Sequence, residues 1–246
     1  MVKKGPLCKV MFRKTSVFLN MILFICIFES TITSITMAHL ENLSVGVFID
    51  GGYYAKINEG LQAKKMASGV NLKALFGYLL DHLSNKFKIE RRLLYITEAH
   101  YYRGRYRAQE ALSKDLLLSE REFEDTLIEN DVIFHYKHMR TTGKNNEIII
   151  EKGIDTWFAL DTYEMTLFRE FDYVVLISGD ADHEMLARKL KALKTHVILM
   201  TWDPANTGST SKFLSEEACT HVNLNTLTAN DANLIKRITK PLADKK

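Results

Sequence analysis

Short apolar runs, separated by longer helical stretches, recur along this 246-residue chain and limit the folds open to it. VGVFID (45–50), DYVVLI (172–177) and THVILMTW (195–202) lack polar alternation, which is typical of strands that are covered on both faces. Further strands are expected at 91–102 and 131–139, and helices at 71–83, 107–130, 153–169 and 183–193. Strands that alternate with helices in this way predict an α/β fold around a mainly parallel sheet.

The first 36 residues form a segment of a different kind. Five basic residues precede the apolar run VFLNMILFICIF (17–28), which is the layout of a secretory signal. The run is shorter than the about 20 apolar residues that a membrane-spanning helix needs. Three interpretations stay open: export, a loosely held membrane anchor, or a true start at Met37.

Cys219 is the one cysteine of the body, because Cys8 and Cys26 lie in the leader. No disulfide can form within the body, which is compatible with the cytosol. We therefore expect a cytoplasmic protein, with export or anchoring through the leader left open. The net charge of +3 indicates no particular partner. The expected organisation is a leader at 1–36, one domain at 37–230 and a polar C-terminal tail at 231–246.

Aspartates stand at the carboxyl ends of two predicted strands. Asp50 ends the first, and Asp180 and Asp182 follow the fourth within SGDADHE. Ligands of open parallel sheets bind in the crevice beyond these strand ends, so Asp50 and Asp180 would share a crevice if their strands are neighbours. Asp155, at the start of a predicted helix, is a further candidate. For Asp155 and Asp182 the alternative is a helix N-cap.

Carboxylates that gather at one site need a positive charge among them. Oxygen ligands of this kind suit Mg²⁺ or Mn²⁺, so the acids predict a site for one of these ions. Asp161 lies well round the helix from Asp155 and is a weaker candidate. His183 and His196 lack the partners of a zinc motif. Ser178 has no nucleophile-elbow motif and is expected to orient an acid or a metal-bound water.

The segment HYYRGRYR (100–107) interleaves basic and aromatic residues after the second predicted strand. Arginines suit backbone phosphates, and aromatic rings can stack on unpaired bases. The alternative is a solvated loop beside a helix start. As a nucleic-acid-binding segment it would act through Arg103, Arg105, Arg107, Tyr102 and Tyr106.

Five motifs occur in the order found in NYN-domain proteins of the LabA-like group: VGVFIDGGYYAKI, EKGIDTWFALD, YVVLISGDADHEMLARKLKAL, THVILMTW and SKFLSEEACTHVNL. Over roughly residues 45–225 the chain resembles this group, which belongs to the PIN-like nuclease superfamily. The resemblance implies a PIN-like three-layer α/β/α sandwich and a Mg²⁺- or Mn²⁺-dependent ribonuclease site. By position, it implies metal-binding and catalytic roles for Asp50, Asp155, Asp180 and Asp182.

Two positions depart from the pattern of the family. DGGYY follows the first strand, where many relatives have an asparagine shortly after the acid, and His183 stands where phenylalanine is more usual. Neither change removes a carboxylate, so metal binding is expected to survive. The departures bear instead on substrate choice and on activity.

The expected chemistry is attack on phosphorus by a water that divalent ions activate. Lys152 would neutralise charge on the scissile phosphate, or else is a solvated lysine. The leading hypothesis is a metal-dependent ribonuclease, with RNA as its partner. The alternative is a catalytically weak NYN-fold module that binds RNA or protein, and a phosphatase is a third hypothesis. No stable membrane partner is expected, and a homo-oligomer is left open.

Overall fold

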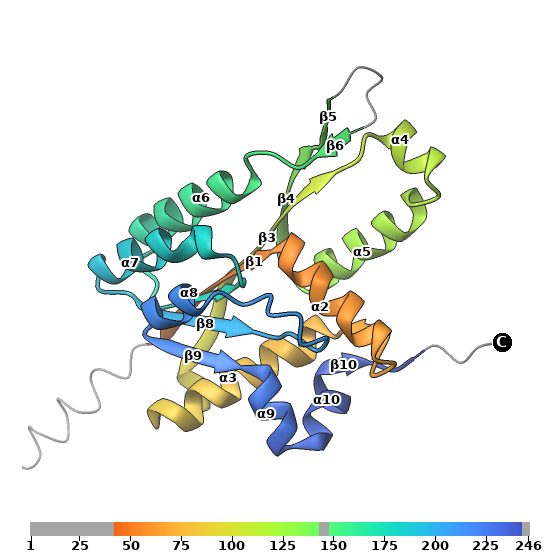
Figure 1. The fold of residues 1–246 in the computed structure, drawn as a ribbon. Coiled ribbons are helices and arrows are strands. Elements are labelled where there is room, and N and C mark those ends of the chain that lie inside the picture. Colours follow the sequence, from red (N-terminus) through yellow and green to blue (C-terminus); the bar gives the residue numbers. More distant parts are fainter. Residues whose placement is uncertain (1–41, 143–147, 243–246) are drawn as a thin grey trace, which may run out of the picture. The chain divides into compact units, whose positions relative to one another are not determined.

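A six-stranded sheet forms the centre of the chain from Leu43 onward (Figure 1). The structure, a computed structural model, describes residues 42–142 and 148–242. Neighbouring strands in the order β4-β3-β1-β7-β8-β9 are all parallel, which confirms the predicted α/β fold. The strands are β1 (Leu43–Asp50), β3 (Leu94–Arg105), β4 (Val132–His138), β7 (Tyr173–Ile177), β8 (His196–Thr201) and β9 (Thr220–Asn223).

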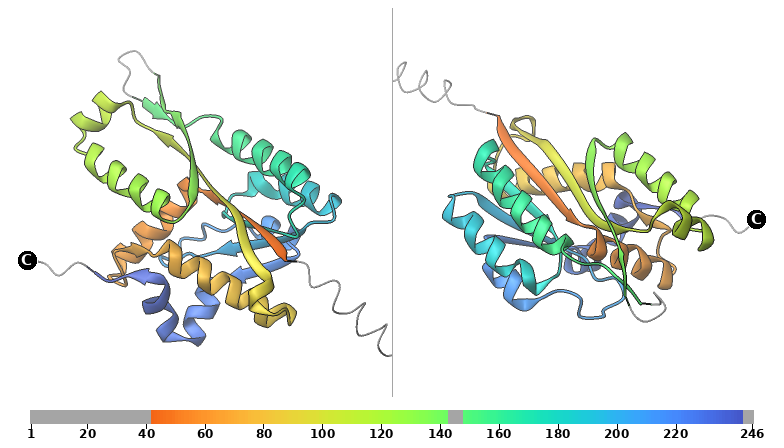
Figure 2. Two further views of the ribbon diagram at one scale, coloured as in Figure 1. Left: turned by 180° about the vertical axis from the view of Figure 1, so that it is seen from behind. Right: turned by 90° about the horizontal axis from the view of Figure 1, so that it is seen from above.

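Helices lie on both faces of the sheet, so the predicted three-layer sandwich is confirmed; Figure 2 shows the layers from two further directions. One face is covered by α2 (Gly51–Ala63), α3 (Leu72–Phe87), α5 (Leu117–Glu129), α9 (Leu224–Asn230) and α10 (Ala232–Ile238). The other is covered by α6 (Ile154–Arg169), α7 (Glu184–Ala192) and α8 (Lys212–Glu217). The remaining elements are α4 (Ala108–Ser113), the 3₁₀ turns η1 (Arg91–Leu93) and η2 (Ala181–His183), and the short pairs β2 (Gly69–Val70) with β10 (Thr239–Lys240) and β5 (Arg140–Thr142) with β6 (Ile148–Ile150).

The central strand β1 shows why the apolar runs lack alternation. Val45, Val47 and Ile49 point into the core under α2 and α3, and Phe48 points into the core under α6 and α7. Side chains of a strand alternate between faces, and here both faces are buried. Gly46 belongs to the second face and leaves room for an aromatic ring there, since a Cβ would lie 2.7 Å from the ring of Phe171.

Two helical segments differ from the sequence prediction. Helix α2 begins directly after β1, although the pair Gly51-Gly52 at its start is typical of a turn. The helix predicted at 107–130 is divided into α4 and α5, because Asp115 between them has φ +59°. A non-glycine residue in this left-handed region ends the regular helix.

The segment after residue 230 is more ordered than the expected polar tail. It contains α10, whose Leu234 and Ile238 are buried against the core, and β10, which pairs with β2. The leader expected at 1–36 lies outside the described residues. Within the described part of the chain, none of the helices combines the length and apolar composition that crossing a bilayer requires.

Candidate active site

A cleft of about 430 Å³ opens at the carboxyl ends of β1 and β7, which are neighbouring strands. Asp50 and Asp180, one from the end of each strand, both line it, together with Asp155 from the first turn of α6. The adjacency of the two strands therefore brings together three of the acids that the sequence singled out. Asp182 is exposed and is not among the residues that line the cleft.

Asp50 is held by both of its carboxylate oxygens. Oδ1 accepts a hydrogen bond from the backbone N–H of Tyr53 at 3.1 Å, so Asp50 is the N-cap of α2. Oδ2 accepts one from the hydroxyl of Ser178 at 3.1 Å. The turn into α2 needs Gly51, because a Cβ there would lie 2.6 Å from the carbonyl oxygen of Tyr102 on β3. Asp50 is consequently fixed at the strand end.

Asp180 is also a cap, and Asp155 and Asp182 are not the caps that the alternative interpretation expected. Oδ1 of Asp180 accepts from the N–H of Asp182 at 3.0 Å. The N-cap of α6 is Gly153 and that of α7 is His183, and neither makes a side-chain capping bond. The N-cap of α6 lies two residues before Asp155, and the N-cap of α7 lies one residue after Asp182.

Burial and the neighbouring acids raise the pKa of the Asp155 carboxyl group. Partial burial raises its pKa first, and repulsion from Asp50 raises it further. His183 lowers the pKa of Asp155, and Asp180 and Asp182 raise it by smaller amounts. The part of this rise that comes from Asp50, Asp180 and Asp182 indicates that negative charge gathers around one cleft, which is the condition that a bound cation would relieve.

Ser178 and His183 form a buried support beneath Asp50. The Ser178 hydroxyl has a single hydrogen, and the carboxylate of Asp50 can only accept it. His183 Nδ1, 2.9 Å from Ser178 Oγ, must therefore carry a hydrogen and donate it. The N–H of Asp180 donates to the same Oγ at 3.2 Å. His183 lies against Phe158, with ring centroids 4.4 Å apart, and its Nε2 has no hydrogen-bond partner among the described residues.

The cleft contains charged residues that the sequence analysis missed. Lys56, on α2, and Glu151, just before α6, both line it. The carboxylate of Glu151 accepts a hydrogen bond from the N–H of Gly104 on β3. Lys56 was missed because α2 itself was not predicted. Lys152, the expected cation, is exposed and does not line the cleft.

The segment 100–107 is not the loop that the sequence suggested. It continues β3 as far as Arg105, where successive side chains point to opposite faces. Tyr102 is fully buried, so no base can stack on it. Arg105 forms ion pairs with Glu124 at 2.8 Å and Glu120 at 3.5 Å. As a stacking platform for RNA, the prediction was wrong for Tyr102, because helices cover both faces of β3 at this point and bury Tyr101 and Tyr102 in opposite cores.

Of the remaining residues of that segment, only Arg107 is freely exposed. Its backbone forms the N-cap of α4, where its N–H donates to Glu110 at 3.2 Å. Tyr106 is half-buried, with the ammonium of Lys114 5.4 Å from its ring centroid. Arg103 is half-buried and donates to the Tyr101 hydroxyl at 3.4 Å. The five predicted RNA-binding residues therefore do not form one continuous exposed track.

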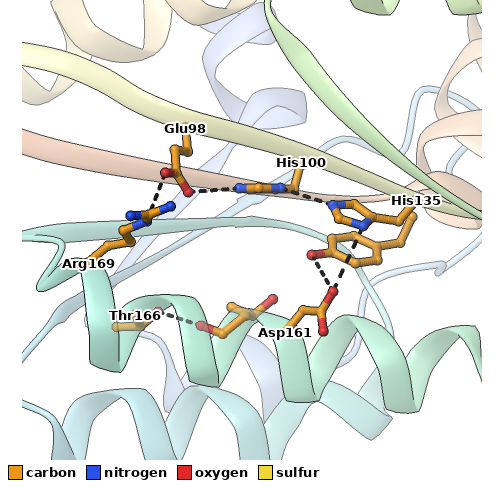
Figure 3. Close-up of polar contacts among 8 residues, drawn as sticks. Glu98, His100, His135, Asp161, Thr166 and Arg169 are labelled. Carbon is orange, nitrogen blue, oxygen red and sulfur yellow. Dashed lines mark hydrogen bonds and ion pairs between the residues drawn. The ribbon is translucent and has the colours of Figure 1, made fainter.

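Asp161 belongs to a separate polar network, shown in Figure 3. Its Oδ2 accepts from the Tyr102 hydroxyl at 3.3 Å and lies 3.9 Å from His135 Nδ1. His135 Nε2 is 3.1 Å from Nδ1 of His100, whose other ring nitrogen is 3.3 Å from Glu98. Burial lowers the pKa of both histidines. Neutral rings can share one hydrogen between the two facing nitrogens, so the network joins α6 to β3 and β4 without contributing to the cleft.

The cleft fits a hard divalent cation in the type of its ligands. Among the described residues, no three His, Cys, Asp or Glu side chains are close enough together to make a ready-formed metal site. Mg²⁺, however, is usually held by one or two carboxylates, retained waters and the phosphates of a substrate. Asp50, Asp155 and Asp180 supply carboxylates around one cavity, which agrees with that mode of binding.

Comparison with known proteins identifies the family. Residues 44–225 match the model of the NYN domain, which is well over half of the chain. A search of curated proteins finds no match. With the parallel sheet, the covering helices and the acids at the strand ends, this match shows that the chain belongs to the NYN-domain family.

Proposed function

We propose that this NYN-domain protein is a divalent-metal-dependent ribonuclease of the LabA-like group. The observation that carries the proposal is the meeting of Asp50, Asp155 and Asp180 in one cleft, although they come from β1, α6 and the end of β7. Three carboxylates with only structural roles would not need to share a cavity. The nuclease-type fold of the family supports the same conclusion.

The acids of the cleft would hold Mg²⁺ or Mn²⁺, which when bound activates a water and stabilises charge on the scissile phosphate. Asp50 is the best-oriented ligand, because Tyr53 N–H and Ser178 fix its two oxygens. Asp182 is proposed to assist from the rim, since it is exposed beside Asp180. Ser178 positions Asp50 and does not attack phosphorus.

Lys56 is the cation proposed to meet the RNA phosphate within the cleft. It lies on α2 beside Asp50 and lines the cavity, whereas Lys152 lies outside that lining. A lysine ammonium is a mobile point charge, which suits neutralisation of a phosphate without fixing its orientation. The role proposed for Lys152 is limited to attracting the RNA as it approaches the cleft.

A catalytically weak module that binds RNA or protein is the second candidate. Two observations favour it. Asp50 uses one oxygen to cap helix α2 and Asp180 uses one to cap the turn η2, and the described acids form no ready-made group of three ligands. A module of this kind would bind RNA with or without divalent ions and would leave it intact.

Cleavage of end-labelled single-stranded RNA tests the proposal, with the full-length protein in Mn²⁺, in Mg²⁺ or in EDTA. Asp180→Asn removes one charge from the cleft with little change of shape. Asp125→Asn is the matched control, because Asp125 is exposed on α5, outside the cleft lining. Parent and control should cleave only with metal, and Asp180→Asn should not cleave.

Thermal melting supplies a readout that does not depend on cleavage. Mn²⁺ should raise the Tm of the parent and of Asp125→Asn, because a ligand that binds only the folded state stabilises it. The rise should shrink for Asp180→Asn, which in EDTA should melt no lower than the parent. Cleavage that persists in Asp180→Asn or in EDTA would overturn the proposal. Tight RNA binding without cleavage in either metal would favour the binding module.

A further inference from the structure

A second pocket lies beside the cleft, on an extension of the sheet. β1 ends at Asp50, opposite Tyr102, but β3 continues for three more residues and pairs there with β4 alone. Arg103 pairs with Tyr136 and Arg105 with His138 in this extension. A cavity of about 230 Å³ lies between the extension and α5. Figure 1 shows β3 and β4 running past the end of β1, with α4 and α5 beside them.

The lining of this pocket combines flat aromatic surfaces with both signs of charge. Its aromatic residues are Tyr101, Tyr106, Phe123 and Tyr136. Its charged residues are Arg103 and Arg105 from β3 and Glu120 and Glu124 from α5. The cavity is smaller than the about 300–1,000 Å³ of pockets for drug-sized ligands. Its size and aromatic walls suit one planar ring system.

Glu124 supplies one buried carboxylate oxygen, Oε1, that accepts no hydrogen bond from the described residues. Only 4% of the residue is exposed. Its Oε2 accepts a hydrogen bond from Arg121 at 2.5 Å. Its Oε1 lies 2.8 Å from Arg105 Nη1 but, like Oε2 of Glu120, accepts no hydrogen bond from the described residues. Arg105 and Arg121 together therefore balance the charge of the two carboxylates, while Oε1 of Glu124 and Oε2 of Glu120 keep the capacity to accept N–H groups.

Arg103 supplies donors on the strand side of the pocket. Its guanidinium donates one long hydrogen bond, 3.4 Å, to the Tyr101 hydroxyl. Its other N–H groups have no hydrogen-bond partner among the described residues. A guanidinium has five N–H donors in a planar fork, which matches two neighbouring acceptors on a ring edge.

The ligand must therefore be planar, with adjacent donors for a carboxylate and adjacent acceptors for a guanidinium. Guanine has both: N1–H and N2–H₂ are neighbouring donors, and O6 and N7 are the acceptors that arginine contacts in pairs. Adenine, cytosine and uracil lack two adjacent donors on one edge. We propose that the pocket between β3 and α5 binds an unpaired guanine of the RNA, with Glu120 and Glu124 accepting from N1–H and N2–H₂ and Arg103 donating to O6 and N7.

The position of the pocket agrees with a base next to the cleavage site. Gly104 lines the pocket and donates its N–H to Glu151, which lines the cleft. A strand whose phosphate lies among the acids of the cleft would thus have a neighbouring base at the pocket. This inference rests on the proposed function for its ligand, RNA, and it names the base that directs cleavage.

Binding measured without catalysis tests the pocket separately from the ribonuclease. Labelled oligouridines that carry a single central G, A, C or U are titrated with the full-length protein in EDTA, and fluorescence anisotropy gives Kd. The RNA with G should bind at least about tenfold more tightly than the others, as expected of a well-formed bidentate base contact. Equal affinities for the four RNAs would overturn the proposal.

Variants of the pocket residues on α5 test whether the preference for G arises in this pocket. Glu124→Gln and Glu120→Gln place an amide where the base needs a carboxylate, and each should reduce the preference for G severalfold. Glu122→Gln is the matched control, since Glu122 is exposed on the same helix and does not line the pocket. If Glu124→Gln loses its cooperative melting transition, the preference for G is tested in Glu120→Gln and Arg103→Met instead. A preference for G that persists in both of these would refute the assignment.

Cleavage of the same RNAs in Mn²⁺ separates the two proposals. A preference for G in EDTA without any cleavage in Mn²⁺ would refute the proposed ribonuclease activity and support the guanine pocket. Cleavage without a preference for G would refute the guanine pocket and support the proposed ribonuclease activity. If both hold, the cut should lie at a fixed distance from the G, and it should lose that register in Glu120→Gln.

Discussion

Replacing Ser178 by alanine should destabilise the protein even though the change removes one oxygen atom. Ser178 is fully buried, and its hydroxyl meets Asp50, His183 and the N–H of Asp180. Asp50 and Asp180 border the cleft, where water can replace the lost bond. His183 is 1% exposed and would keep a hydrogen on Nδ1 without an acceptor. That orphaned donor costs about 1–3 kcal/mol, and the lost bond to a charged carboxylate adds roughly 1 kcal/mol.

The expected loss for Ser178→Ala is therefore ~2–4 kcal/mol, or roughly 5–15 °C in Tm for a domain of this size. Urea unfolding in EDTA measures it without interference from metal. The double variant Ser178→Ala/His183→Phe removes donor and acceptor together, and a phenylalanine can pack on Phe158 as the imidazole does. It should be more stable than Ser178→Ala by about 1–2 kcal/mol. A loss below about 0.5 kcal/mol for the single variant, or strictly additive effects, would refute the hydrogen-bond assignment.

Four further substitutions have expected outcomes. Gly46→Ala should cost ~1–3 kcal/mol in urea unfolding, because its methyl group would lie 2.7 Å from an aromatic ring, while Gly77→Ala, with nothing within 4 Å, should stabilise by about 0.4–1 kcal/mol. Asp155→Asn should gain stability relative to the parent as the pH rises above about 3.9 in EDTA: the pKa of Asp155 is raised in the folded state, so its ionisation opposes folding. A pH-independent difference would contradict this. Leu234→Ala should cost about 2–5 kcal/mol if α10 is part of the core; a loss near zero would make the segment a tail.

The sheet could be predicted from the sequence because its central strands are buried on both faces. Phe48 and Ile49 face different cores, and the chain must place apolar residues at both positions. The acids at the strand ends could be predicted for a related reason: a charged residue that follows such a run marks the point where the strand leaves the core. Parallel strands that are neighbours then bring their ends together, as happens with Asp50 and Asp180.

Other features depend on partners that are remote in sequence. Tyr102 has aromatic and basic neighbours along the chain, and only the packing of α6 on β3 decides that it is buried. Arg105 is accommodated at the end of β3 because Glu120 and Glu124, on α5, neutralise its charge. The N-cap considered at Asp155 lies two residues earlier, at Gly153, which is within the usual uncertainty of a helix boundary.

The order of the strands also sets when the cleft can form. Ser178 bonds to Asp50 across 128 positions of sequence, and β1 lies in the middle of the sheet between β3 and β7. At about 5–20 residues per second, a ribosome needs roughly 6–26 s to cover that interval. Throughout it, β1 has been made but has no β7 to pair with, and Asp50 stands apart from Asp180. The proposed ribonuclease would therefore be inactive while most of its chain is being synthesised.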